Sequence, residues 1–234
     1  MTADEVVAEL ATLGTESTKK TLMRHGAREP FYGVKVEDLK KIQKRVKKDH
    51  ELALALYDTG VSDAMYLAAL IAEPDKMKKG DLERWLKGAY WYMLSDYAVA
   101  WVAAESPHAL AVAHKWIDSR KELTASSGWA TLSSYVSITP DENLDLDLIE
   151  RLLTRVEGTI HAAPNRARYS MNGFVIAVGC FVESLAERAK AAARAIGQVE
   201  VDMGGTSCKV PSAVEYIEKV ESRGRRGKRK SARC

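Results

Sequence analysis

The sequence predicts an all-α fold in which pairs of helices stack into a solenoid, a curved α-α superhelix. Apolar residues recur at helical spacing along nearly the whole chain, and no alternating pattern of useful strand length is present. The predicted helices also come in pairs, a shorter polar one followed by a longer apolar one. Stacked pairs of this kind bury a continuous core and leave one helix of each pair on the inner, concave surface.

The first third of the chain shows this pattern with clear boundaries. Apolar periodicity predicts helices over Asp4–Leu13, Glu16–Arg24, Val36–Asp49, Glu51–Tyr57 and Ser62–Ile71. Pro30 and Gly33 interrupt it between the second and third helices, because neither residue favours a helix interior. Ser62 is expected to cap its helix, and Pro74 ends it.

The middle of the chain contains its most aromatic stretch, WLKGAYWYMLSDYAVAW at Trp85–Trp101. Asp81 is expected to cap the helix that leads into it, and Gly88 permits a turn. Asp96 is the only carboxylate in this run and lies four residues after Tyr92, on the same helical face. Two interpretations stay open: a core helix with an incidental acid, or an acid among aromatic faces that stabilises a cation.

The second half continues with helices and ends in a basic segment. Helices are predicted over Pro107–Ile117, Glu122–Val136, Leu144–Val156, Arg166–Val182, Ala186–Ile196 and Ser212–Val220. Val199–Val210 contains Gly204-Gly205 and is the one region that does not have a helical pattern. The expected organisation is one helical-repeat domain over residues 1–222 and a basic C-terminal tail over residues 223–234.

A short motif recurs within the longer helices. Ser95-Asp96-Tyr97, Ser127-Gly128-Trp129 and Asn172-Gly173-Phe174 each place a polar residue two positions before an aromatic one, at intervals of 32 and 45 residues. These intervals bracket the period of about 40 residues that is typical of HEAT repeats. We therefore expect Ser95, Ser127 and Asn172 to lie with Asp96 on one strip of the concave surface. Glycine inside a helix costs about 1 kcal/mol relative to alanine, so Gly128 and Gly173 indicate close approach to the backbone.

The net charge of +3 conceals two basic blocks. The tail carries seven Lys or Arg and no acid, and Lys35–Lys48 carries seven against two acids. Such blocks attract polyanions through phosphate neutralisation, although each is also consistent with a solvated surface. The candidate phosphate contacts are basic residues of the two blocks and of one later helix: Lys40, Lys44, Lys47, Lys48, Arg166, Arg168, Arg225, Arg226, Lys228, Arg229 and Lys230.

Several other classes of protein are disfavoured. The three cysteines have no metal-binding spacing, and neither a P-loop nor a dinucleotide fingerprint is present, so no metal and no cofactor are expected. No apolar run is long enough to cross a membrane, and no signal peptide is evident at the start. We expect a cytoplasmic protein, associated with the nucleoid if it binds DNA.

Four segments resemble the AlkD-like DNA alkylation repair family, which is built from HEAT-like repeats. They are FYGVKVEDLKKI (31–42), WYMLSDY (91–97), WIDS (116–119) and RYSMNGFVIAVGCFV (168–182). The segment 199–217 and the basic tail resemble one subgroup of that family. The resemblance implies double-stranded DNA as partner and, for its characterised members, a DNA N-glycosylase that excises cationic alkylated purines such as 3-methyladenine and 7-methylguanine.

The same resemblance implies roles for individual residues. The family's catalytic aspartate corresponds to Asp96, and its neighbouring aromatic residue corresponds to Tyr92. The substrate-binding candidates are polar and aromatic residues of the inner helices: Trp91, Ser126, Ser127, Trp129 and Asn172. The chain departs from the family where Ser126 or Ser127 replaces an arginine and Cys180 replaces a tryptophan.

Three functions follow from these observations and stay open at this point. The chain is a DNA-binding repair protein with glycosylase activity, a binder of damaged or branched DNA without catalysis, or a helical-repeat scaffold for another protein. The position of the Asp96 carboxylate discriminates between them, because a glycosylase must present it to the DNA-binding groove.

Overall fold

In the computed structural model, which describes residues 1–224 and 227–233, all assigned secondary structure is helical, as predicted. The N-terminal helices are α1 (Ala3–Leu13), α2 (Glu16–Arg24), α3 (Val36–Val46), α4 (His50–Asp58), α5 (Ser62–Ile71) and α6 (Lys79–Gly88). A π-helical segment, η2 (Met93–Val99), leads directly into α7 (Ala100–Glu105). The remaining helices are α8 (Ala109–Ile117), α9 (Glu122–Ile138), α10 (Leu146–Thr159), α11 (Asn165–Phe181), α12 (Ala186–Ile196) and α13 (Ala213–Ser222).

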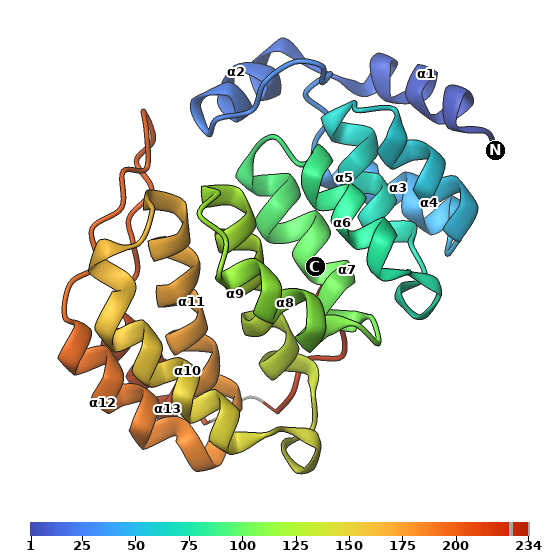
Figure 1. The fold of residues 1–234 in the computed structure, drawn as a ribbon. Coiled ribbons are helices and arrows are strands. Elements are labelled where there is room, and N and C mark those ends of the chain that lie inside the picture. Colours follow the sequence, from blue (N-terminus) through green and yellow to red (C-terminus); the bar gives the residue numbers. More distant parts are fainter. Residues whose placement is uncertain (225–226, 234) are drawn as a thin grey trace.

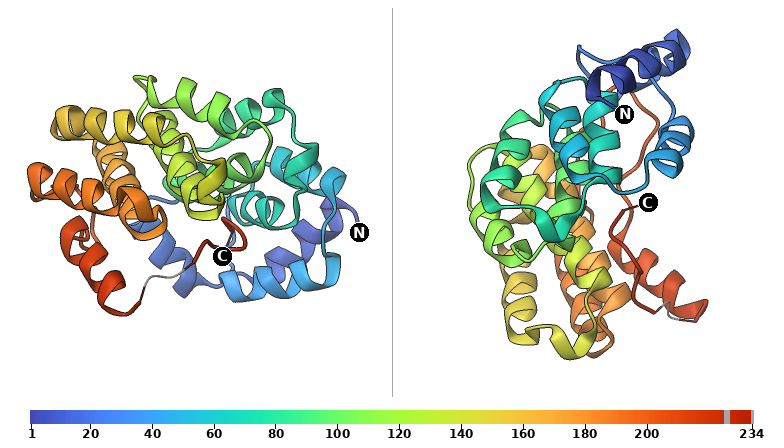
Figure 2. Two further views of the ribbon diagram at one scale, coloured as in Figure 1. Left: turned by 90° about the horizontal axis from the view of Figure 1, so that it is seen from below. Right: turned by 90° about the vertical axis from the view of Figure 1, so that its right-hand side faces the viewer.

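The helices stack in pairs to form a curved array (Figure 1). Helices α5, η2–α7, α9 and α11 pack side by side as one layer, and each packs against the helix that precedes it in the chain. Figure 2 shows helices α1–α3 and α13 projecting from the same side of the array, with the C-terminal end of the chain between them. We call this the open side. The predicted solenoid of helix pairs is confirmed.

Two apolar cores hold the array together, one in each half. The N-terminal core is centred on Trp85, whose ring stacks on Tyr57 at 4.2 Å between centroids. The C-terminal core contains Trp129 packed against Phe174, with 5.4 Å between ring centroids. Burial of apolar side chains, aliphatic as well as aromatic, is the main stabilising contribution in each half.

Local structure differs from the sequence prediction at two helix starts. Helix α6 begins at Lys79, before Asp81, whose carboxylate accepts a hydrogen bond from the backbone N–H of Lys78 at 3.2 Å. Ser62 is the first residue of α5, and its hydroxyl accepts a hydrogen bond from the indole of Trp91. Both polar groups are therefore used, but Ser62 binds a distant indole and does not cap its own helix.

The two glycines that indicated close backbone approach behave differently. A Cβ at Gly128 would lie 2.7 Å from the backbone nitrogen of Ile117, so glycine is required where α8 and α9 touch. A Cβ at Gly173 would meet nothing within 4 Å. The prediction is confirmed for Gly128, whereas Gly173 faces open space.

The basic tail returns to the body of the molecule after α13. Backbone and side-chain groups of residues 228–233 bind the carboxyl ends of α5, α7 and α9, and Ala232 is fully buried. Arg233 donates to the carbonyls of Ala69 (3.1 Å) and Ala72 (2.9 Å) and forms an ion pair with Glu105. Carbonyl groups at helix carboxyl ends carry partial negative charge, so cations are stabilising there.

Candidate functional site

Asp96 lies in the interior of the array. Its side chain is only 4% exposed, and its Oδ2 accepts a hydrogen bond from Nε of Arg166 at 2.8 Å. The expectation that Asp96 lies on a strip of the concave surface is therefore wrong, because its carboxylate is buried. The π-helical turn of η2 places the carboxylate against α9 and α11, and Arg166 at the start of α11 closes the access from solvent.

Serine hydroxyls satisfy the rest of the carboxylate. Ser95 donates to Oδ1 and Ser126 donates to Oδ2, each at 2.8 Å. The hydroxyls of Ser126 and Ser170 are themselves 2.8 Å apart, and that of Ser127 donates to the carbonyl of Ser95. Ser95 and Ser127 therefore lie together beside Asp96, as the recurring motif predicts, but they form a buried hydrogen-bond network and not a strip of the concave surface.

The Arg166 guanidinium occupies a cage of acid and aromatic groups. Its central carbon lies 3.9 Å from the ring centroid of Tyr92 and 4.2 Å from that of Tyr169. Burial raises the pKa of the Asp96 carboxyl, and the charge and hydrogen bond of Arg166 oppose that rise. The sequence indicates an acid among aromatic rings that stabilises a cation, and the structure contains this arrangement. The cation is the protein's own Arg166.

Tyr92 closes the outer side of this centre. Its hydroxyl lies 3.1 Å from Nδ1 of His25, and burial raises its pKa. A hollow of about 410 Å³ opens beyond it, lined by His25 together with Arg24 and Arg28 from the N-terminal segment. Sequence reasoning missed His25 because 67 residues separate it from Tyr92, and no local spacing connects them.

The other predicted substrate-binding residues are buried and have structural partners. Trp91 donates its indole N–H to Ser62 at 2.8 Å, and Trp129 lies in the C-terminal core. The Asn172 amide donates to the carbonyl of Pro211 at 2.9 Å. Asn172 therefore holds the segment before α13 and does not join the strip that contains Ser126 and Ser127.

The predicted phosphate contacts of the first basic block have different positions. Lys44 and Lys47 are exposed, with Lys47 ending α3 at a positive φ of 65°, and Lys40 is half-buried. Lys48 lies at the surface, yet its Nζ donates to the carbonyls of Leu70 (3.1 Å) and Ala72 (3.2 Å). Lys48 thus joins Arg233 in capping α5 and is not free to bind phosphate.

Some basic residues of α11 and the tail are engaged by acids or partly buried, and others are exposed. Arg166 is committed to Asp96, and Arg168 is half-buried. Lys228 forms an ion pair with Asp141 at 2.7 Å and donates to the carbonyl of Val136. Arg229 and Lys230 are exposed, whereas Arg225 and Arg226 lie outside the described residues.

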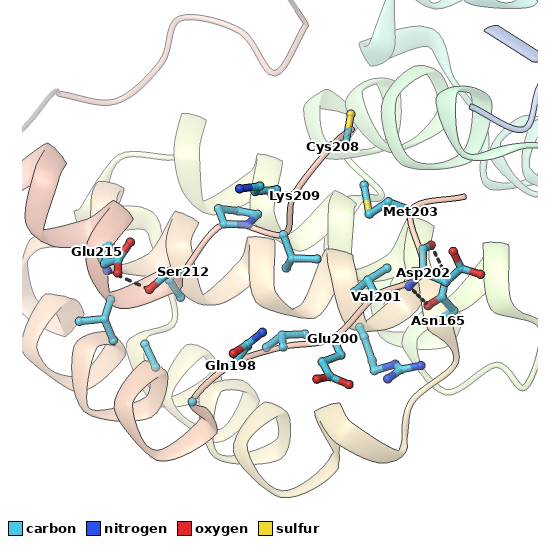
Figure 3. Close-up of a pocket in the computed structure, with 18 of the residues that line it drawn as sticks. Asn165, Gln198, Glu200, Val201, Asp202, Met203, Cys208, Lys209, Ser212 and Glu215 are labelled. Carbon is cyan, nitrogen blue, oxygen red and sulfur yellow. Dashed lines mark hydrogen bonds between the residues drawn. The ribbon is translucent and has the colours of Figure 1, made fainter. Parts of the chain in front are cut away.

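The non-helical segment predicted over Val199–Val210 lines a hollow of about 940 Å³ (Figure 3). Asn165 at the start of α11 holds this segment by two hydrogen bonds to the backbone of Asp202, of 2.9 and 2.8 Å. Lys209 and Arg194 line the hollow together with Glu200 and Glu215, so its lining has no dominant charge.

The described part of the chain holds neither a cluster of metal-ligating side chains nor a single helix that could span a membrane. No group of three or more His, Cys, Asp or Glu side chains is arranged to hold a metal ion within residues 1–224 and 227–233. Over the same residues, no single helix is long and apolar enough to cross a membrane. The sharply bent pair Asn165–Phe181 and Glu183–Ile196 has the required length and apolar composition only when its two helices are taken together.

The stacked pairs, the polar strip across their inner helices and the aromatic cage define a HEAT-like helical-repeat protein. The chain belongs to the family of DNA alkylation repair enzymes, whose model matches residues 6–179.

Relatives and a solved structure match nearly the whole chain. It is 38% identical over 229 residues to uncharacterized proteins Lin0241 of Listeria innocua and Lmo0209 of Listeria monocytogenes, covering 95% of this chain and 99% of each relative. The solved structure comes from a new family of proteins related to the HEAT-like repeat DNA glycosylases with affinity for branched DNA structures. It is 41% identical, has a TM-score of 0.92, and both chains are fully covered.

Proposed function

We propose that this protein binds branched DNA on its open side and does not excise bases. The observation that carries the proposal is the ion pair between Asp96 and Arg166, with side chains only 4% and 10% exposed. Excision of a cationic purine needs a carboxylate that stabilises the positively charged sugar in the transition state. Here that carboxylate is neutralised by an internal cation that already occupies the aromatic cage.

The distribution of exposed cations supports DNA as the ligand. Lys44 on α3 and Arg229 in the C-terminal segment are exposed and belong to elements of the open side. Arg24 and Arg28 line the hollow beside Tyr92. Cations spread over a surface neutralise phosphates and supply affinity that depends on salt. The affinity for branched DNA of the related solved protein supports junctions as the preferred form.

Binding and excision are tested separately on the wild-type protein. Fluorescence anisotropy compares a four-way junction with a linear duplex of equal length at two salt concentrations. We expect tighter binding to the junction and affinity that falls with salt. Equal affinity for the two DNAs would contradict the preference for branches. We also expect no release of 7-methylguanine from methylated DNA; release by the wild-type protein would establish the enzyme instead.

A pair of lysine variants locates the binding side. Lys44→Gln removes an exposed cation of α3. Lys87→Gln removes one from the end of α6, which lies outside the layer formed by α5, η2–α7, α9 and α11. A phosphate contact contributes a slope of about −0.9 to the dependence of log affinity on log salt. We therefore expect Lys44→Gln to reduce the salt slope by up to about that amount. Lys87→Gln should leave it unchanged, and the reverse result would place DNA on the opposite side.

A further inference from the structure

A second hollow lies between α11, α13 and the start of the C-terminal segment. Its volume is about 620 Å³, within the range of about 300–1,000 Å³ that holds small ligands. Helix α13 is fixed beside it because Ile217 packs directly onto Gly179 of α11, where a Cβ would lie 2.4 Å from the Ile217 side chain. Gly173 leaves the hollow open, since no atom lies within 4 Å of the position of its missing Cβ.

The floor of the hollow is apolar and one wall is aromatic. Ile176, Phe181 and Val220 line it from the two helices. Tyr216 of α13 is 49% exposed, one of few large apolar side chains at the surface of the described residues. An exposed aromatic ring beside an apolar floor provides a surface on which a flat ring stacks.

The rim of the hollow carries positive charge without acidic partners. Lys219, Arg223 and Arg229 line it, and none of the described lining residues is Asp or Glu. Within the described residues, no ion pair engages the side chains of these three cations, whereas the neighbouring Lys228 and Arg233 are paired with acids. The C-terminal segment therefore directs two cations to helix ends and presents Arg229 to the hollow.

We infer that this hollow receives an unpaired nucleotide of branched DNA, its base on Tyr216 and its flanking phosphates on the cationic rim. Proteins that hold single-stranded nucleic acid combine a cationic surface with aromatic stacking in this way. The inference rests on the proposed function. Ile176 lies ten residues after Arg166 on α11, roughly 15 Å along the helix axis, so this hollow and the hollow beside Tyr92 lie along the same helix.

The inference is tested with a duplex that carries a single-stranded thymidine arm. Tyr216→Leu keeps apolar bulk but removes the stacking surface, and we expect affinity for the armed duplex to fall about tenfold. The affinity of this variant for a fully paired four-way junction should stay within about twofold of wild type, because the stacked base is missing from that DNA. Unchanged affinity for the armed duplex would overturn the inference.

Two arginine variants and a crosslinking experiment test the inference without relying on Tyr216→Leu alone. Arg223→Gln should weaken binding of the armed duplex, whereas Arg151→Gln on the exposed surface of α10 should not. An arm that contains 5-iodouracil should crosslink to Tyr216 under ultraviolet light; crosslinks that map only outside the hollow would overturn the inference. Failure of wild type to bind the fully paired junction would instead contradict the proposed function, so the two failures are distinguishable.

Discussion

Two arginines from basic segments of the sequence, Arg166 and Arg233, form ion pairs with carboxylates in different surroundings. Asp96 and Arg166 meet in the middle of the array, within a serine network and between tyrosine rings. Glu105 and Arg233 meet at its edge, with side chains 15% and 9% exposed and backbone carbonyls of α5 close by. In the first pair the arginine fills the space between the tyrosine rings beside the carboxylate, whereas the second pair ties the C-terminal segment to the ends of α5 and α7.

The difference shows what each pair contributes. The side chains of the central pair are only 4% and 10% exposed, so removing one partner leaves an uncompensated charge in the protein interior. In the edge pair the carboxylate is more exposed, 15% for Glu105 against 4% for Asp96, and the arginine has carbonyl acceptors besides the carboxylate. We therefore expect the central pair to contribute more to stability, whereas the edge pair holds the C-terminal segment against α5 and α7.

The largest expected effect is that of Asp96→Asn. Because Arg166 then has no compensating charge, we expect a loss of about 3–5 kcal/mol in the free energy of unfolding. Urea denaturation followed by circular dichroism measures it. The double variant Asp96→Asn, Arg166→Gln should recover part of the loss, since it removes the unpaired cation. A stability equal to that of wild type would mean that Asp96 is open to solvent.

A smaller effect is expected at the edge of the array. Arg233→Gln removes the ion pair with Glu105 and weakens the bonds to the carbonyls of Ala69 and Ala72. We expect a loss of about 1–3 kcal/mol, measured by the same denaturation. Lys230→Gln, at an exposed position of the same segment, is the matched control and should change stability by less than about 0.5 kcal/mol. A larger loss from Arg233→Gln than from Asp96→Asn would reverse the comparison.

The smallest effect is a change in titration at Lys48. Burial, followed by repulsion from Arg233, lowers the pKa of Lys48 from its ordinary 10.5 to about 8. Between about pH 8 and 10.5 the unfolded chain keeps a proton that the folded chain has lost, so this group makes stability rise with pH there.

Arg233→Gln should move the pKa of Lys48 upward by removing that repulsion. Nuclear magnetic resonance titration of the lysine side chains measures the shift. An unchanged pKa in the variant would show that the C-terminal segment does not reach α5 in solution.

How far the sequence predicted the site is clear from three residues. Local composition alone points to Tyr92 and Asp96, because an acid inside an apolar, aromatic helix needs a compensating group. The sequence also points to Arg166, but as a phosphate contact. It does not connect Arg166 with Asp96, because 70 residues separate them. Its position at the start of α11 is equally compatible with an exposed phosphate contact, and only packing of α11 against η2 excludes that.

The sequence by itself determined the helical repeats, because apolar spacing specifies which face each helix buries. It also determined the polar strip that contains Ser95 and Ser127, since this strip recurs with the repeat. The tertiary structure alone decided which charges meet: Arg166 with Asp96, Arg233 with Glu105, and Arg229 with solvent. Charge partners are chosen by distance in space, and the curvature of the array sets those distances between residues far apart in the chain.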